Sequence, residues 1–385
     1  MEVSDHCAVV VKSMLKDWGP QPFRSIDAWQ MESDFKELVK DKWNSYVVRR
    51  DGITNFKDKL KILKEDLKVW NREVFGNLEV SKNNILKQIE VLDNQDNNSE
   101  QEESTKMKSM ELMSQLKEIE NKIDSLLCQK VRSNWLKHGD LNSKFYHSSI
   151  KWRRIRNEVK GVEVGGQWCE DPEVVRGQAK NLFEERFTAT KDFGVRLGAV
   201  EFKTISQEDK LSLISAFSEE EIREAVRQCD GSKSPGPDGF NLSFIHKNWE
   251  TLKEDIYAAV SQFHESGTIP KGCNASLIAL IPKVRDPMKL DQYRPISLVG
   301  SCYKIISKIL SNRIKKVLPS VIDECQSAFL KDRGMLDSVL MANEIFEDIM
   351  RNKKRGLCLK VDFEKAYDSG RWEFLYDMLQ RLIPS

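Results

Sequence analysis

The chain has 385 residues, of which 40% are hydrophobic and 31% charged, as in a helix-rich globular protein of two or three domains. Its 61 Lys and Arg nearly balance its 60 Asp and Glu. Net charge alone therefore does not indicate nucleic-acid binding, which has to be sought in local groups of charges.

The cysteines and the apolar segments limit the class of protein further. Eight cysteines are scattered singly, without the paired spacing of a disulfide framework or a structural zinc site. The N-terminus lacks the basic and apolar regions of a signal peptide, and the longest apolar run, residues 275–281, is too short to cross a bilayer. We therefore expect an intracellular protein, in the nucleus or the cytoplasm, without membrane contact or a disulfide partner.

The N-terminal third reads as a short remnant followed by helices. Residues 1–12 are predicted to be the end of a preceding domain. From Phe56 to Val74, and again from Leu112 to Leu126, apolar residues alternate steps of four and three, as in a heptad seam. Residues 93–104 between them are polar throughout. The pattern predicts a long antiparallel helical hairpin within residues 13–130, either a packing element or a coiled coil that binds a partner.

The segment 130–156 is basic and aromatic. It holds eight Lys and Arg against one acid, Asp140, with aromatic residues interleaved. Cations neutralise phosphates and aromatic rings stack on unpaired bases, so the segment suits RNA. The alternative is a solvated helix face whose aromatic residues point into the core. The candidate RNA contacts are Lys137, Lys144, Lys151, Arg153, Arg154 and Arg156.

Helix signals follow at regular intervals. Ser206 and Ser218 each precede an acidic residue by three positions, the spacing of a helix start. Two prolines and two glycines in residues 234–239 predict tight turns. Residues 303–318 carry a buried apolar stripe flanked by cations, and Pro319 is predicted to end that helix.

Residues 356–363 alternate apolar and polar side chains and predict a strand. Asp362 lies near its end, and the chain turns away after it. A carboxylate fixed at the exit of a strand is well placed to hold Mg²⁺.

Several strings together resemble one family. Residues 362–368 (DFEKAYD) resemble the first catalytic motif of LINE-type (non-LTR) retrotransposon reverse transcriptases. Residues 232–240 (SKSPGPDGF), 277–283, 293–319 and 326–344 resemble that family's fingers, in the family's order. Residues 135–147 look like a segment that plant members carry ahead of the fingers. Ser4-Asp5-His6 is similar to the closing motif of the endonuclease that precedes the polymerase in these elements.

The resemblance implies roles for single residues. Asp362, with the backbone carbonyl of Phe363, would hold the Mg²⁺ ions of a two-metal nucleotidyl transfer. Tyr367 would pack under the sugar of the incoming dNTP and exclude a 2′-OH. Arg294, assisted by Lys283 or Lys289, would grip the triphosphate. Asp5 and His6 are expected to be inactive remnants of the endonuclease.

The resemblance also implies an architecture: an α+β fold that is predominantly α, with a long helical hairpin followed by incomplete fingers and palm. The expected parts are a basic N-terminal extension of the polymerase in residues 131–230, then the fingers and the first part of the palm in 231–385. Two departures stand out. Gly370 and Arg371 replace an apolar residue and an acid, and the sequence stops at Ser385, before the family's paired aspartates.

We therefore expect that this chain alone does not copy RNA into DNA, although the complete enzyme would bind an RNA template, a DNA primer and dNTP. Two alternatives are an RNA-binding module without chemistry and a helical structural or interaction protein.

Overall fold

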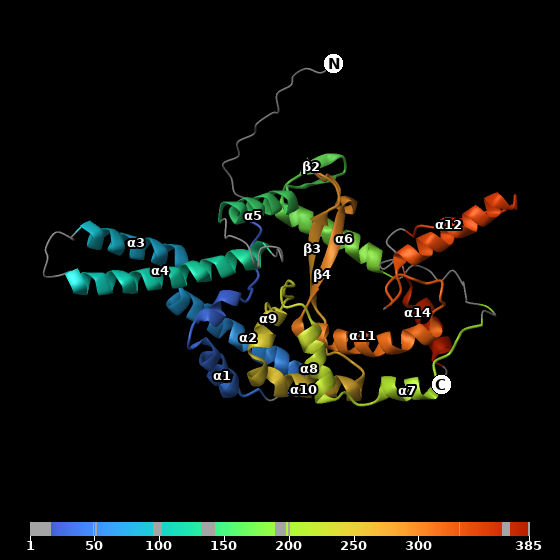
Figure 1. Cartoon of the computed structure of the whole chain (residues 1–385), viewed down its shortest axis with the longest axis horizontal. Coiled ribbons are helices and arrows are strands. Elements are labelled where there is room, and N and C mark those ends of the chain that lie inside the picture. Colours follow the sequence, from blue (N-terminus) through green and yellow to red (C-terminus); the bar gives the residue numbers. More distant parts are fainter. Residues whose placement is uncertain are drawn as a thin grey trace, which may run out of the picture.

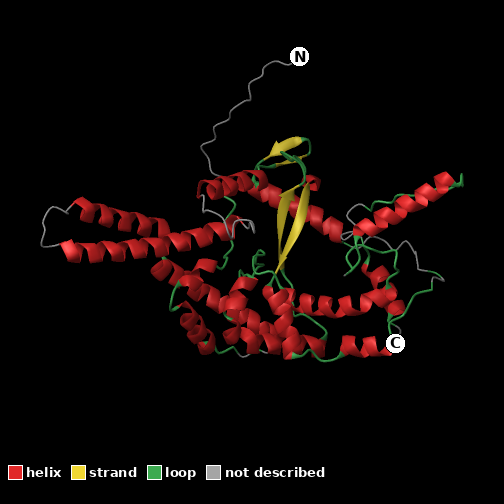
Figure 2. Ribbon diagram, in the orientation of Figure 1, coloured by secondary structure: helices red, strands yellow, loops and turns green. Residues whose placement is uncertain are grey.

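The computed structural model describes residues 17–48, 50, 52–94, 102–131, 143–188, 198, 201–330, 332–363 and 370–383. The described chain is predominantly helical, with two small antiparallel sheets of two strands each (Figure 2). The predicted fold class, α+β and predominantly α, is confirmed.

One large hydrophobic core joins the N-terminal helices to the middle of the chain (Figure 1). The N-terminal elements are η1 (Asp27–Met31), α1 (Phe35–Ser45), α2 (Gly52–Trp70) and the π-helix η2 (Asn71–Phe75). The later elements are α8 (Glu219–Gln228), α9 (Leu242–Lys247), α10 (Trp249–Ser266) and α11 (Ser301–Val321). The apolar seam of α2 packs on α10, so the core crosses the expected domain boundary at residue 130.

The helical hairpin is present, but one of its arms differs from the prediction. Helices α3 (Leu78–Asn94) and α4 (Glu102–Val131) pack against each other and project from the core, at the left of Figure 1. Ile85 and Ile89 of α3 meet Leu112 of α4. The prediction that the seam beginning at Phe56 forms the first arm is wrong, because α10 already covers that seam.

A second group of elements lies above the core in Figure 1. It contains α5 (Ser143–Asn157), α6 (Pro172–Phe187) and the short strands β1 (Val162–Val164) and β2 (Gln167–Cys169). A longer hairpin, β3 (Ser276–Pro282) and β4 (Tyr293–Val299), rises from the core to reach this group. Its register pairs Ser276 with Val299 at the core end and Pro282 with Tyr293 at the loop end, where η4 (Leu290–Gln292) precedes β4.

The predicted helix starts are confirmed at α7 (Gln207–Ile214) and α8. The hydroxyl of Ser206 accepts the Asp209 N–H, and the hydroxyl of Ser218 accepts the Glu221 N–H. The predicted stop at Pro319 is wrong, because α11 continues to Val321. A proline this near the end of a helix removes one backbone hydrogen bond and disturbs few following residues.

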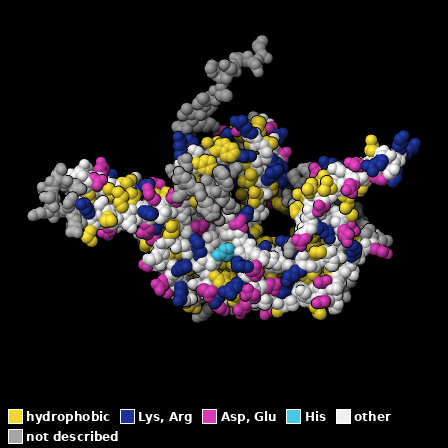
Figure 3. Space-filling view, viewed as in Figure 1, with side chains coloured by type: hydrophobic (Ala, Val, Ile, Leu, Met, Phe, Trp, Pro, Cys, Tyr) yellow, Lys and Arg dark blue, Asp and Glu magenta, His cyan; other side chains and the backbone are white. Residues whose placement is uncertain are grey.

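The predicted strand 356–363 is also wrong. These residues are irregular and belong to neither sheet of the described chain, and Leu357 and Leu359 are 96% and 81% exposed. Alternating side chains form a strand only where a neighbouring strand accepts their backbone hydrogen bonds. The flanking helices are α12 (Met335–Arg351) and α14 (Trp372–Leu382), and hydrophobic side chains are exposed along α12, at the right of Figure 3.

Among the described residues, no helix is both long enough and apolar enough to span a bilayer.

Candidate functional site

The three cations expected to grip a triphosphate lie together at the loop end of the β3–β4 hairpin. Arg294 pairs with Ile281 in the ladder, and Lys283 follows the last ladder pair directly. Lys289 lies between them in the connecting loop, immediately before η4. All three side chains are exposed. Lys283 donates to the Asp291 carbonyl at 2.8 Å, whereas the Arg294 guanidinium makes no hydrogen bond to another described residue.

This loop is held by the small hairpin β1–β2. The Glu163 N–H of β1 donates to the Met288 carbonyl at 2.8 Å, and Lys160 forms an ion pair with Asp286 at 2.9 Å. The Lys160 bond lowers the pKa of the Asp286 carboxyl. The side chain of Gln292 accepts the N–H groups of Met288 and Lys289, which closes the loop on itself. The three cations are therefore carried on a loop that has its own supports.

Asp362 and Phe363 lie in the exposed segment between α12 and α14. The Asp362 carboxylate makes no hydrogen bond or ion pair with a described residue, so no such bond joins it to Arg294. The described residues contain no group of three His, Cys, Asp or Glu that could hold a metal ion. Taken alone, Asp362 does not make a two-metal site. Tyr367, Asp5 and His6 lie outside the described residues.

The basic segment forms α5, and its side chains divide between core and solvent. Tyr146 is 1% exposed and packs on Leu127 and Val131 of α4, as expected if the aromatic residues of this helix point into the core. Trp152, in contrast, is 62% exposed, and the Arg156 guanidinium lies 5.1 Å from its ring centre.

The charged residues of α5 are exposed: Lys144, Lys151, Arg153, Arg154 and Arg156. Arg153 in addition donates to the Val131 carbonyl at 2.7 Å and so closes the end of α4. Lys137 lies outside the described residues. The exposed cations beside an exposed indole match the composition expected for RNA contact.

The residues of the Ser234–Gly239 turn fasten the core end of the β3–β4 hairpin. Asp238 accepts the Ser301 N–H at 2.5 Å and the Phe240 N–H at 3.3 Å, and therefore caps the start of α11. Burial raises the pKa of the Asp238 carboxyl, while these N–H groups oppose the rise. Gly239 has a φ of +83°, which a residue with a Cβ adopts at a cost.

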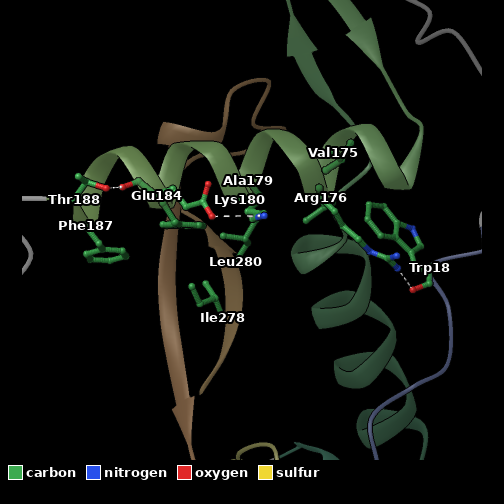
Figure 4. A pocket seen from close by; sticks show the side chains of 12 residues that line it. Trp18, Val175, Arg176, Ala179, Lys180, Glu184, Phe187, Thr188, Ile278 and Leu280 are labelled. Carbon is green, nitrogen blue, oxygen red and sulfur yellow. Dashed lines mark hydrogen bonds and ion pairs between the residues drawn. The ribbon is translucent and has the colours of Figure 1, made fainter. Parts of the chain in front are cut away.

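A groove that the sequence did not reveal lies between α6 and β3, with a volume of about 680 Å³ (Figure 4). The rings of Phe183 and Phe187 are nearly parallel, 6.1 Å apart, and Ile278 and Leu280 of β3 face them. At the other end the Arg176 guanidinium donates to the Trp18 carbonyl. No sequence motif marked α6, because its apolar residues look like an ordinary buried stripe.

Comparisons with known proteins agree on one family. Residues 281–385 match the family described as reverse transcriptase (RNA-dependent DNA polymerase). The chain is 25% identical to the transposon TX1 uncharacterized 149 kDa protein of Xenopus laevis, over 91% of this chain and 27% of the relative. It is 26% identical to the Pol polyprotein of the retrotransposable element R1 of Bradysia coprophila, over 57% of this chain and 21% of that protein.

A third relative is the RNA-directed DNA polymerase of the mobile element jockey of Drosophila melanogaster. It is 24% identical over 57% of this chain and 24% of the relative. The chain thus spans about a quarter of the length of these curated relatives.

The matched region begins in β3 and contains the loop with Lys283, Lys289 and Arg294 as well as Asp362. Reverse transcriptases use divalent metal ions and act on a nucleic-acid template and primer. The likeness to plant members of the family stays a prediction. By this match and these relatives, the chain is related to the LINE-type (non-LTR) retrotransposon reverse transcriptases.

Proposed function

We propose that residues 231–385 contribute the fingers and the first part of the palm of an RNA-directed DNA polymerase. The observation that carries the proposal is the reverse transcriptase match over residues 281–385, which takes in every described candidate for dNTP and metal binding. In this proposal residues 131–230 are the basic extension that contacts RNA. The helices within 13–130 then support both parts.

The arrangement of charge on the β3–β4 hairpin supports a triphosphate-binding role. Lys283 directly follows β3 and lies two ladder positions beyond Ile281, the partner of Arg294 on β4, so the two side chains are close enough to contact one anion. Arg offers a fork of N–H donors and Lys a compact charge, a combination that suits a triphosphate. Asp362 would supply one carboxylate to Mg²⁺, and the Phe363 carbonyl and Tyr367 would contact metal and sugar.

Primer extension on an RNA template tests the proposal. The chain is incubated with Mg²⁺ and dNTPs beside two variants, Asp362→Ala and the control Asp348→Ala, which removes an exposed carboxylate paired with Lys354. Binding of a fluorescent template–primer is measured on the same samples. We expect all three proteins to bind it, and any incorporation to disappear only in Asp362→Ala.

Two results would count against this function. Incorporation that survives in Asp362→Ala removes Asp362 from the metal site. A folded chain that does not bind the template–primer contradicts the polymerase assignment and favours the helical interaction protein.

A second function, RNA binding without chemistry, is favoured by α5. Its exposed cations lie beside an exposed indole, and Arg156 covers one face of the Trp152 ring. A strand could place phosphates on Lys151 and Arg154 and a base on that ring. Replacing Trp152 by Ala is expected to weaken RNA binding about 10-fold, which corresponds to roughly 1.4 kcal/mol of stacking. Replacing the buried Tyr146 by Phe is the control and is expected to leave RNA affinity unchanged.

A further inference from the structure

A second cavity lies inside the main body, where α2 faces the Ser234–Gly239 turn and the start of α11. Its volume is about 250 Å³. One wall consists of Pro237, Gly300 and Cys302, and Gly272 and Cys273 close it from the loop that follows α10. The facing wall is α2. None of the described residues expected to contact metal, dNTP or RNA lines this cavity.

Three lysines of α2 line the cavity: Lys57, Lys61 and Lys64. Their spacing of four and then three residues places them along one face of the helix, one turn apart. Lys57 and Lys64 are half-buried and Lys61 is exposed. None of them forms an ion pair with another residue in the described parts of the chain. Three lysines on one wall of a cavity, without an ion pair to any described residue, favour the binding of an anion.

The acids nearest the three lysines have other partners among the described residues. Asp238 also lines the cavity and accepts the Ser301 and Phe240 N–H groups, and burial raises the pKa of its carboxyl. Asp58, next to Lys57 in sequence, pairs with Arg50 at 3.5 Å. Since Asp238 already takes the first N–H of α11, the lysines rather than the helix end would hold an anion here.

Two of the three lysines have defined neighbours around the cavity. The Lys57 Nζ lies beside Gly272, 3.4 Å from the position that a Cβ there would take. The Lys64 Nζ lies 5.8 Å from the centre of the Phe23 ring. Burial raises the pKa of the Cys273 thiol, and the charge of Lys57 opposes that rise. Lys57 is thus close to Cys273, which gives the site a chemical probe.

This cavity is distinct from the candidate triphosphate site. Ala275 and Gly300 flank the core end of the β3–β4 hairpin, whereas Lys283 and Arg294 lie at its loop end. Seven ladder pairs separate the two ends, about 20 Å at 3.3 Å per residue. A single nucleotide does not reach both.

We propose that the cavity between α2 and the Ser234–Gly239 turn binds a phosphate group of a nucleic acid or nucleotide through Lys57, Lys61 and Lys64. The phosphate chemistry follows from the lysines and the cavity. The nucleic-acid source rests on the proposed polymerase function. A bound RNA strand and a free nucleotide both present a phosphate group. The affinities measured for RNA and for a nucleotide distinguish these two sources.

The experiment compares the whole chain with the triple variant Lys57→Gln/Lys61→Gln/Lys64→Gln. The control triple variant, Lys36→Gln/Lys40→Gln/Lys68→Gln, removes the same charge from α1 and α2 outside the cavity. Anisotropy measures binding of a labelled single-stranded RNA and of a fluorescent dATP between 50 and 300 mM salt. Lys61→Gln alone changes an exposed side chain only, so it tests the site without disturbing the fold.

Each of the three lysines is expected to contribute about 5-fold to affinity at 0.1 M salt, and the one phosphate that they neutralise about 0.7 to the slope of log K against log salt. The cavity triple variant should therefore bind RNA, nucleotide or both up to about 100-fold more weakly, and the control much less so. Loss for RNA alone identifies a strand as the source, and loss for dATP alone a nucleotide.

A local readout accompanies the affinities. Pyrophosphate is expected to slow alkylation of Cys273, which lines the cavity, and not of the exposed Cys325. Equal affinities and salt slopes in wild type and cavity variant, or equal losses in the two triple variants, would overturn the proposal. If Asp362→Ala abolishes incorporation while the lysine variants bind normally, the phosphate site fails and the polymerase function stands.

Discussion

Replacing Arg313 by Met removes a guanidinium that ties α11 to the α7–α8 corner. Arg313 is 6% exposed. Its Nε and Nη2 donate to both oxygens of Glu221 at 2.7 Å, and its remaining N–H groups donate to the carbonyls of Leu213, Ser215 and Ala216. The guanidinium also lies 4.1 Å from the centre of the Phe217 ring. Arg313 thus binds three carbonyls at the end of α7, where His264 Nε2 also lies 3.1 Å from the Ile214 and Ser215 carbonyls.

Methionine keeps the aliphatic packing but leaves the Glu221 carboxylate, 22% exposed, without its partner. Breaking a buried ion pair on one side costs roughly 3–5 kcal/mol. We expect the free energy of unfolding to fall by about 4 kcal/mol in Arg313→Met. Arg313→Lys keeps the charge and loses the planar fork, so about 2 kcal/mol is expected for it.

Urea unfolding followed by tryptophan fluorescence measures these changes, because Trp29 and Trp43 lie in the main core. The matched control is Arg227→Met, which breaks an Arg–Glu pair on α8 whose arginine is 78% exposed and should leave the free energy of unfolding nearly unchanged. A loss below about 1 kcal/mol in Arg313→Met, similar to the control, would refute the reasoning.

Three further changes have defined outcomes. Gly239→Ala forces a Cβ onto a φ of +83° and to within 2.4 Å of a ring carbon of Phe23; thermal unfolding should show a loss of about 2–3 kcal/mol. Asn241→Ala removes the cap of α9 and should cost about 1–2 kcal/mol by urea unfolding. Burial raises the pKa of Cys302 to about 12, so at pH 8 its thiol should resist alkylation in the folded chain while the exposed Cys358 reacts, as peptide mass spectrometry would show.

The local features were the ones that the sequence could predict. The start of α8 depends on a hydrogen bond from the Glu221 N–H to the Ser218 hydroxyl. The two residues are three positions apart, so the sequence alone predicts this helix start. The partner of the Glu221 side chain is Arg313, 92 residues later, and no local pattern reveals it. The seam of α2 was read correctly as an apolar face, but its partner α10 is supplied by the tertiary fold.

In the candidate site, too, local patterns could be predicted from the sequence and contacts between distant segments could not. The resemblance to the family grouped Lys283, Lys289 and Arg294, and the β3–β4 hairpin brings them to the same end. Alternation in residues 356–363 predicted a strand, yet a strand depends on a neighbour that alternation does not provide. The lysines of α2 have a readable spacing of their own. Only the fold shows that Pro237 and Gly300 enclose a cavity opposite them.

The continuity of α4 has a mechanical consequence. A helix of 30 residues is about 45 Å long, and this one has its outer end paired with α3 and its inner end packed on η1 and α5. Lys122, buried about two thirds of the way along α4, forms an ion pair with Glu32 at 2.8 Å and so fastens the helix to the residue that follows η1. A molecule bound where α4 meets α3 would therefore tilt the whole of α4, and with it α5, which packs on the other end of α4 and carries exposed cations.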